Sequence, residues 1–421
     1  MKNAQPISRR SLIKSAAIAG SALAAPKLFA SQPLRAGPRH ILVGSGTPNG
    51  ILSFAWHEFS GELIPDRSLA ASFSHSTWLH RTPDRYLYVA SELDEFQGQP
   101  TGAVGSFKVS GMGLAPLRLA PLSLVAAHGA GTCHLTTDRT GKVVICANYA
   151  GGSAASFLPK DGVLGEAVWS EHYKGYPGGG PVPDRQEAAH AHFVSLSPDN
   201  RFVCINDLGS DKIHIYKLNT ETGILTPAGT YNARPGDGPR TLHFLSYTYS
   251  TAKSGNANIP DEDPKPLPDG PVAYCVNELN STVDVLAWNK TDGSLRSIQK
   301  VSLNPRATAP DGTKFTNTAC DAVLTGDGRH AYFANRGDDF LLAFDIDPRS
   351  GTLSPLAGTP RTSCGGKTPR NFTLDPNERF MLVANQNSSN LSVFARDPKT
   401  GQLSNEGKNY PAATPMCIVF V

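Results

Sequence analysis

The 421-residue sequence lacks several features that define common classes of protein. An Ala/Gly-rich apolar run, residues 15–25, is too short and too weakly hydrophobic to span a bilayer permanently. There is no basic stripe for nucleic acid and no polybasic patch for a membrane surface. The nucleophile elbow G-x-S-x-G is also missing. These absences argue against stable membrane insertion, nucleic-acid binding and a serine nucleophile.

Cysteine is scarce, and its spacing suggests no chemistry. The seven cysteines are an odd number and include no CxxC pair. Cys146, Cys204 and Cys275 fall at equivalent places in three apolar segments, where a small buried hydrophobic residue suffices. We therefore expect neither a disulfide framework nor a zinc site, and no metal or other cofactor.

Residues 1–30 are predicted to be an export signal. Residues 8–14, SRRSLIK, have the form of a twin-arginine signal, an apolar run follows, and Leu28-Phe29-Ala30 offers a cleavage site. This segment holds five basic residues and no acidic ones, so the formal net charge changes from +3 to −2 without it. We predict export by the twin-arginine machinery to a bacterial periplasm, the alternative being a disordered basic N-terminus.

The sequence does contain a repeated pattern of short β-strands. In residues 190–227 we predict strands at 193–196, 201–205, 212–218 and 224–226, separated by turns rich in Pro, Asp, Asn and Gly. The pattern occurs seven times, and 58 residues separate Tyr149 from Asp207 and again Glu278 from Arg336. A four-stranded sheet this small cannot cover its own faces, so the repeat predicts a radial arrangement of sheets.

The two ends of the repeat complete each other. The last strand, 417–421, has the pattern of the strand that begins a unit, but no further strands follow it. The unit that starts at His40 has the later strands of a unit, but no beginning strand precedes them. Pairing the N- and C-terminal strands closes the ring, so residues 31–421 are predicted to form an all-β, seven-bladed β-propeller. Residues 245–271 are predicted to be a surface insertion. The Gly/Pro-rich residues 173–189 are predicted to cover one end of the central channel.

Equivalent positions in the repeat predict two rings of side chains around this channel. The first ring follows the end of each second strand and reads Gly46, Glu92, Tyr149, Asp207, Glu278, Arg336 and Gln386. The second ring, counted back nine residues from the basic residue that ends each turn, reads Ser76, Cys133, His192, Cys320 and Arg370, and Arg240 takes the matching place in the blade with the insertion. Burying so many ionisable groups is costly unless they pair or bind a ligand, so this end of the channel is the predicted functional site.

Each candidate also has a structural alternative. Glu278 could lock the blades together by pairing with an arginine across the channel. His192 could be a strand histidine that bonds a turn carbonyl, with His190, two residues earlier, as its supporting partner. Asp207 could cap a turn.

Several blocks of the sequence resemble a known family. The blocks HAHFVSLSPDNRF, GPRTLHF, VNELNSTVDV and ANRGDD are similar to those of the seven-bladed β-propeller lactonases, which include the bacterial 6-phosphogluconolactonase and the fungal carboxy-cis,cis-muconate cyclase. The resemblance extends from about His40 to Val421. It implies metal-free hydrolysis or closure of a lactone. Carried over block by block, it implies four catalytic residues: His192, Arg240, Glu278 and Arg336.

The sequence departs from the family pattern in three places. Thr241-Leu242-His243 follows Arg240 where the family commonly has a histidine, Cys320-Asp321 stands where a glutamate is more usual, and the insertion is extra. These departures concern the substrate more than the chemistry. Export favours a free aldonolactone over a phosphorylated metabolite of the cytoplasm, although the family name points to 6-phosphogluconolactonase-like activity.

The predicted mechanism is general acid–base hydrolysis. Arg240 and Arg336 hold the lactone carbonyl, and either Glu278 or His192 is the base while the other donates a proton to the leaving alkoxide. Arg370 is predicted to hold an acidic substituent. The remaining predicted substrate-binding residues are His190, Asp207, Tyr149 and Glu92.

Three alternative functions stay open. A calcium-dependent propeller lactonase would use Glu92, Asn148, Asp207 and Glu278 as ligands, although the nearby arginines would repel the ion. A muconate-type cyclase would catalyse lactone closure instead of hydrolysis. A non-catalytic scaffold would place its contacts on outer loops and would need no buried cluster of charges.

Overall fold

The computed structural model describes residues 40–48, 50–66, 73–111, 117–248, 265–303 and 317–421. The chain divides into two units, 1–35 and 36–421, and every described residue belongs to the second. The predicted signal, residues 1–30, lies outside the described residues. Those residues form β-strands and no helix, so none of them forms a helix that could cross a membrane.

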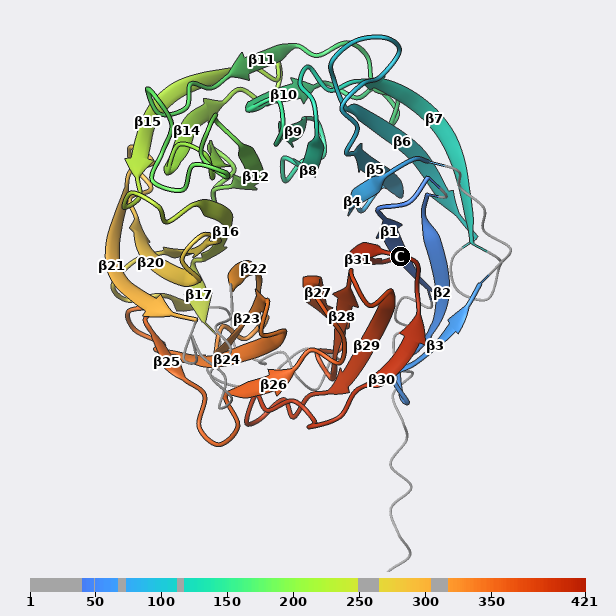
Figure 1. Ribbon diagram of the computed structural model, residues 1–421, viewed down its shortest axis with the longest axis vertical. Helices are drawn as coiled ribbons and strands as arrows, with labels where there is room; N and C mark the ends of the chain where they lie inside the picture. Colours follow the sequence, from blue (N-terminus) through green and yellow to red (C-terminus); the bar gives the residue numbers. More distant parts are fainter. Residues whose placement is uncertain (1–39, 49, 67–72, 112–116, 249–264, 304–316) are drawn as a thin grey trace, which may run out of the picture. The chain divides into compact units, whose positions relative to one another are not determined.

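Seven antiparallel sheets surround a common axis (Figure 1). Counted outward, their innermost strands are β4 (Ser76–Arg81), β8 (Thr132–Thr137), β12 (Ala191–Leu196), β16 (Pro239–Leu245), β22 (Thr318–Leu324), β27 (Pro369–Leu374) and β31 (Pro415–Phe420). The second strands are β1 (His40–Ser45), β5 (Tyr86–Ser91), β9 (Val144–Asn148), β13 (Phe202–Asp207), β19 (Val272–Asn277), β23 (His330–Arg336) and β28 (Phe380–Asn385).

The outer half of each sheet follows the same order. The third strands are β2 (Leu52–His57), β6 (Ala103–Ser110), β10 (Ser153–Phe157), β14 (Lys212–Leu218), β20 (Thr282–Trp288), β24 (Phe340–Ile346) and β29 (Asn390–Ala395). The outermost strands are β3 (Glu62–Pro65), β7 (Arg118–Ala126), β11 (Trp169–His172), β15 (Leu225–Asn232), β21 (Leu295–Ser302), β25 (Leu353–Pro355) with β26 (Arg361–Ser363), and β30 (Lys408–Pro411). The outermost strand β15 extends six residues beyond the predicted 224–226.

The second strands are apolar over most of their length because they are covered on both faces. All six residues of β13 are buried, and so are all five of β9. Strands buried on both faces read as continuous apolar runs rather than alternating ones. The core therefore lies between neighbouring sheets: Ile145 of β9 and Ala154 of β10 pack in one cluster with Val194 and Ile205 of the next sheet.

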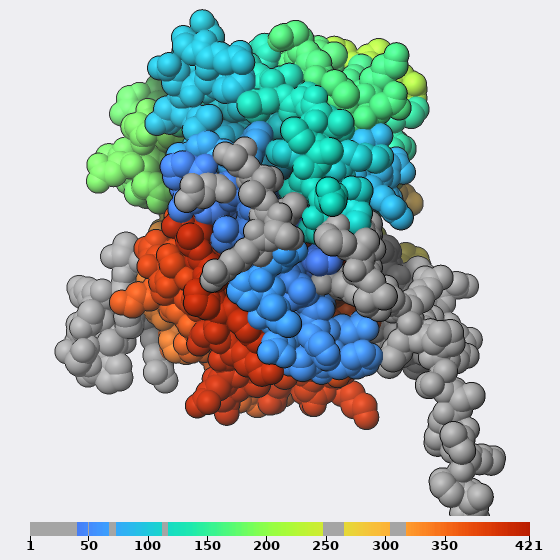
Figure 2. Space-filling view, turned by 90° about the vertical axis from the view of Figure 1, so that its right-hand side faces the viewer, coloured from blue at the N-terminus to red at the C-terminus, as the bar shows by residue number. Residues whose placement is uncertain are grey.

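The ring is closed by the two ends of the propeller chain. Strand β31 pairs with β1 in antiparallel register, with Val419 opposite Leu42 and Ile418 opposite Val43. Figure 2 shows the last strands, in red, packed beside the first strands, in blue. The predicted closure and the predicted seven-bladed, all-β fold are both confirmed.

The predicted insertion falls between the innermost and second strands of one sheet. Its described ends form a two-stranded ladder, β17 (Tyr247–Thr248) with β18 (Lys265–Pro266). Residues 249–264 lie outside the described part of the chain. The regular pairing of β16 with β19 continues on either side of the insertion, with Leu245 opposite Val272.

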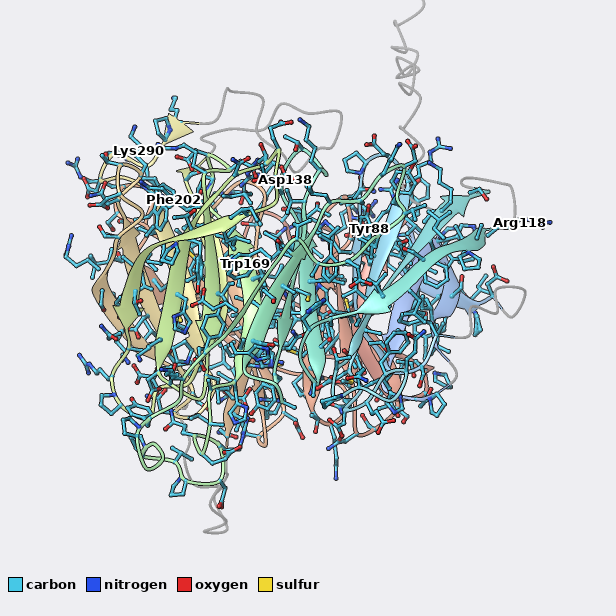
Figure 3. All side chains as sticks on the ribbon, turned by 90° about the horizontal axis from the view of Figure 1, so that it is seen from above. Tyr88, Arg118, Asp138, Trp169, Phe202 and Lys290 are labelled. Carbon is cyan, nitrogen blue, oxygen red and sulfur yellow. The ribbon has the colours of Figure 1, made fainter. Side chains whose placement is uncertain are left out.

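Antiparallel topology places all the second-strand ends on one side of the ring. The turns between first and second strands and those between third and fourth strands share the opposite side. Asp138 and Lys290, from one turn of each kind, both lie toward the upper end of the strands in Figure 3. Residues that directly follow a second strand, such as Tyr149 and Glu278, therefore gather at the other end.

Candidate active site

A β-bulge in each innermost strand supplies the side chains that line the axis. The pairing of every innermost strand with its second strand shifts register at one place. The residues left without an opposite partner there are Thr77, Cys133, His192, Arg240, Cys320 with Asp321, Arg370 and Met416. Thr77, Cys133, His192, Arg240, Arg370 and Met416 line one small cavity. Bulges commonly redirect side chains next to active sites.

One member of the predicted second ring was wrong. Ser76 pairs with Ser91, and the bulge residue of its strand is Thr77. Counting back gave the wrong residue because the turn after this strand is one residue shorter than in the other blade compared. The backbone N–H of Thr82 donates to the carbonyl of Tyr86, four residues later, whereas that of the equivalent Ser197 donates to Phe202, five residues later. Counting residues from the turn cannot detect such a difference in turn length.

Glu278 is the centre of the charged cluster. It directly follows β19, and its side chain is only 3% exposed. Its Oε2 lies 2.9 Å from Arg240 Nε and 2.7 Å from Arg336 Nη2, while its Oε1 lies 2.5 Å from Arg185 Nη2. The inter-blade pairing that the sequence left open as an alternative is therefore present, because Arg336 belongs to the next sheet.

The electrostatics of Glu278 follow from these partners. Burial alone would raise the pKa of the Glu278 carboxyl, but the guanidinium groups of Arg336, Arg240 and Arg185 hold it well below its ordinary value. Glu278 is thus a permanent anion with very weak basicity. A general base works best when its pKa is close to the operating pH, so the cluster makes Glu278 a poor proton acceptor.

His192 has the opposite character. Burial, followed by the charge of Arg240, lowers the pKa of His192 well below 6.5, so the ring is neutral. Its buried Nδ1 has no hydrogen-bond partner among the described residues, so the structure provides no turn carbonyl for that atom. The edge of the ring meets Tyr149, with centroids 5.7 Å apart at 82°. The lowered pKa weakens the basicity of His192 as well, so what distinguishes it from Glu278 is a neutral ring whose Nδ1 has no hydrogen-bond partner among the described residues.

His190 and Tyr149 form the wall beside His192. The His190 ring stacks on Tyr149, with centroids 4.4 Å apart at 13°. His190 Nδ1 lies 3.0 Å from the Tyr149 carbonyl oxygen, and its Nε2 lies 2.9 Å from Glu187 Oε1. His190 thus contacts Tyr149, which in turn contacts His192.

Arg370 and Glu92 lie at the more exposed side of the cluster. Arg370 Nη2 is 3.6 Å from Glu92 Oε2, and the two side chains are 19% and 29% exposed. Together with Glu278 and its three arginines, this gives four arginines and two glutamates in the cluster, with Glu187 as a third and more exposed carboxylate beside His190. The excess of positive charge suits an anionic ligand or a developing oxyanion.

Asp207 lies outside this cluster. It is fully buried and accepts hydrogen bonds from the backbone N–H groups of His190, at 2.8 Å, and Ser210, at 3.2 Å, and from the Ser210 hydroxyl. These are the contacts of a turn-capping carboxylate, the alternative that the sequence allowed. Asn148, another residue considered for calcium, has its amide engaged: Oδ1 accepts a hydrogen bond from the Thr132 hydroxyl, and Nδ2 donates to Ser153 Oγ.

A layer of aromatic rings closes the axis beyond the bulge residues. The centroid of the His134 ring lies 3.8 Å from that of Phe193 and 4.4 Å from that of Trp78. The ring centroids of His243 and Phe193 are 5.3 Å apart. On the far side of this layer is a second cavity of about 690 Å³, whose lining includes His80, Thr136, Arg139, Ser195 and His243. The axis therefore has two distinct ends, a small charged cavity and a larger one with an aromatic floor.

Arg185 is the site residue that sequence reasoning missed. The segment 173–189 was predicted to cover one end of the channel, and the structure brings Arg185 of that segment onto Glu278 and Tyr149. The available signal was a lone arginine in a Gly/Pro-rich loop that leads directly to His190. Because the loop lies outside the repeat, register could not assign it to a ring.

Fold and site together define a class: a β-propeller that carries an arginine-, glutamate- and histidine-lined site on its axis. The family described as "Lactonase, 7-bladed beta-propeller" matches residues 35–420. The 6-phosphogluconolactonase of Bacillus subtilis is 31% identical over 379 residues, covering 89% of this chain and 95% of the relative. That of Formosa agariphila is 30% identical over 373 residues, covering 86% and 94%. The chain belongs to the seven-bladed β-propeller lactonase family.

A solved structure gives the same result in three dimensions. The periplasmic gluconolactonase of Pseudomonas aeruginosa matches with a TM-score of 0.76 and 30% sequence identity, covering 91% of this chain and 98% of that chain. The propeller of this protein therefore matches a lactonase over almost its whole length.

Proposed function

We propose that this protein hydrolyses a free sugar-acid lactone in its propeller channel by general acid–base catalysis without a metal. One observation carries the proposal: the Glu278 carboxylate, held by three arginines, lies in the same site as the neutral His192. The surplus positive charge suits the oxyanion that forms when a lactone carbonyl is attacked, and it would repel a divalent cation.

In the proposed reaction His192 is the base and Glu278 is the carboxylate that positions the arginines. Nδ1 of His192 accepts a proton from water as the water oxygen attacks the carbonyl carbon. The carbonyl electron pair moves to oxygen, where Arg240 and Arg336 stabilise the negative charge. The ring C–O bond then breaks, and the imidazolium returns its proton to the leaving alkoxide. The product is the open-chain hydroxy acid.

The substrate class is drawn from two features. The N-terminal twin-arginine pattern implies export to a periplasm, and the similar Pseudomonas aeruginosa protein is a periplasmic gluconolactonase. A free aldonolactone is thus the first candidate. A 6-phosphogluconolactone-like substrate is the second, favoured by the relatives named 6-phosphogluconolactonase and by Arg370, which could hold an acidic substituent.

The test is a substrate panel with the mature protein. Hydrolysis of a free aldonolactone, its 6-phosphorylated form and a muconolactone is followed with a pH indicator, with and without a chelator. We expect the free aldonolactone to be hydrolysed fastest, chelator to leave the rate unchanged, and Arg240→Ala to lose activity. Equal rates for wild type and Arg240→Ala would remove the enzymatic proposal, and a chelator-sensitive rate would replace the metal-free mechanism.

Localisation is tested separately. In a bacterial host with a twin-arginine system, the full chain should appear in the periplasmic fraction, and Arg9→Lys with Arg10→Lys should retain it in the cytoplasm. Periplasmic delivery of the double variant at the wild-type level would contradict the proposed export route.

A further inference from the structure

Arg185 differs from the other arginines of the site in where it comes from. Arg240 and Arg370 project from innermost strands and Arg336 from a second strand, whereas Arg185 lies in the segment between β11 and β12. Its side chain is 35% exposed, compared with 5% for Arg240 and 15% for Arg336. Arg185 therefore covers Glu278 from the solvent side of the cluster.

The loop that carries Arg185 is fixed immediately next to it. Gln186 is fully buried and donates from Nε2 to the Leu208 carbonyl oxygen at 3.1 Å and to Asp211 Oδ2 at 2.8 Å. The hydroxyl of Tyr176, near the start of the loop, donates to the same Asp211 oxygen at 2.8 Å. The base of the loop is thus anchored, so only the Arg185 side chain needs to move to uncover the site.

The same anchor connects the loop to the strand that carries Arg240. Asp211 also accepts hydrogen bonds from the backbone N–H groups of Gly236 and Gly238, each at 2.7 Å. Gly238 lies two residues before Arg240. One buried carboxylate therefore sets the position of the loop relative to the strand-borne part of the site.

Arg185 contacts Glu278 at an oxygen that the other arginines do not use. Arg240 and Arg336 both pair with Oε2, whereas Arg185 pairs with Oε1 and also donates to the Tyr149 hydroxyl at 3.1 Å. If Arg185 leaves, Glu278 keeps two ion pairs, so its charge stays compensated. Oε1 then becomes available as a hydrogen-bond acceptor, and the guanidinium becomes available to a ligand.

We propose that Arg185 is a substrate-contacting residue that exchanges partners when a polyhydroxylated lactone binds. A ring hydroxyl of the lactone donates to Glu278 Oε1, and the released guanidinium donates to the carbonyl oxygen as negative charge develops there. Arg185 thereby joins the oxyanion-stabilising group and covers the bound substrate. This inference rests on the proposed lactonase function and adds a fourth arginine to its chemistry.

The test compares Arg185→Ala with wild type on a hydroxylated aldonolactone. We expect kcat to fall about 10²-fold, the usual effect of losing one oxyanion donor, while the melting temperature stays near that of wild type. Added guanidinium ion, well below denaturing concentrations and matched against sodium chloride, should restore part of kcat, because the vacated position is open to solvent. Arg185→Lys should lie between the two proteins.

The matched control is Arg234→Ala, an exposed arginine in the connection before Arg240 whose side chain is not part of the cluster. It should behave as wild type with and without guanidinium. Wild-type kcat for Arg185→Ala overturns the inference, as does a loss that guanidinium does not rescue and that comes with a lower melting temperature. A wild-type protein that hydrolyses no lactone overturns the proposed function and this inference with it.

Discussion

The two ends of the propeller axis differ in what they bury. The larger cavity, about 690 Å³, has a floor formed by Trp78, His134 and Phe193, and its histidine His243 has a local partner in Asp321 at 2.9 Å. The cavity at the opposite end is far smaller, yet that end concentrates Glu278, its arginines and a histidine nitrogen that has no hydrogen-bond partner in the described part of the chain. The larger cavity and the cluster of ionisable side chains therefore point to different ends of the axis as the functional site. Burying charged groups costs free energy, so buried charges are usually either ion-paired or functional. The charged end is therefore the better candidate for the active site.

We expect the largest effect on activity and stability from removing the negative charge of Glu278 at the charged end. Glu278→Gln leaves three guanidinium groups, of which that of Arg240 is buried, facing a neutral amide, so we expect activity to be lost. The free energy of unfolding should fall by about 3–5 kcal/mol, the usual result of breaking a buried ion pair. Urea denaturation and lactone hydrolysis measure the two effects.

The control for this variant is Asp321→Asn at the aromatic end, where the carboxylate faces one half-buried histidine and the amide of Asn371. Its loss of stability should be clearly smaller, and its activity should remain. Equal losses of stability and activity in Glu278→Gln and Asp321→Asn would contradict the assignment of the active site to the charged end.

A second substitution separates chemistry from stability within the charged end. His192→Gln removes the proposed base, and we expect kcat to fall by about 10²- to 10⁴-fold. Because Nδ1 has no protein partner to lose among the described residues, the melting temperature should stay close to that of wild type. Stopped-flow hydrolysis and thermal denaturation test this, with Arg234→Ala as the control. An active His192→Gln protein would return Glu278 to the role of base.

The pH dependence of the rate tests the neutral state of His192. Its pKa is lowered by burial and then by Arg240, so the base remains unprotonated as the pH falls through 6.5. We expect kcat/KM to stay level there and to decline only at more acid pH. A pH–rate profile in buffers of constant ionic strength measures this, and an acid limb centred at or above 6.5 would contradict the assignment.

The smallest effect is expected at the aromatic end. Burial lowers the pKa of His80 to about 4, so the folded protein resists protonating it while the unfolded chain protonates it near 6.5. Its contribution to stability is fully present above pH 6.5 and is lost progressively as the pH falls toward 4. His80→Gln should flatten part of this dependence in thermal melts and leave lactone hydrolysis unchanged. A large loss of activity would link the two ends of the axis.

Much of the site was predictable because the repeat fixes register. An Asn near the end of the second strand, followed by Glu or Arg, placed Glu278 and Arg336 at one level, and the block GPR placed Arg240 beside them. The first ring, counted forward from the strand end, needed no correction at Glu278 or Arg336. The second ring, counted back across a turn, failed at Ser76 because that turn is shorter.

Other features depended on contacts between segments far apart in the sequence. Asp207 occupies a ring position, yet its carboxylate is used by its own turn and by the backbone of His190. Arg185 occupies no ring position, yet it reaches Glu278, 93 residues away. Neither outcome is visible in the repeat, because a side chain's partner depends on how loops fold over the ring.

The sequence by itself determined the number of blades, the closure of the ring by its two ends and the ionisable residues near the axis, because strand periodicity and turn chemistry are local properties that repeat. Only the tertiary structure decided which of those groups are ion-paired, which nitrogen has no partner among the residues described and which loop covers the site. Those properties depend on distances of a few ångströms between different blades, and electrostatic energies change steeply over that range.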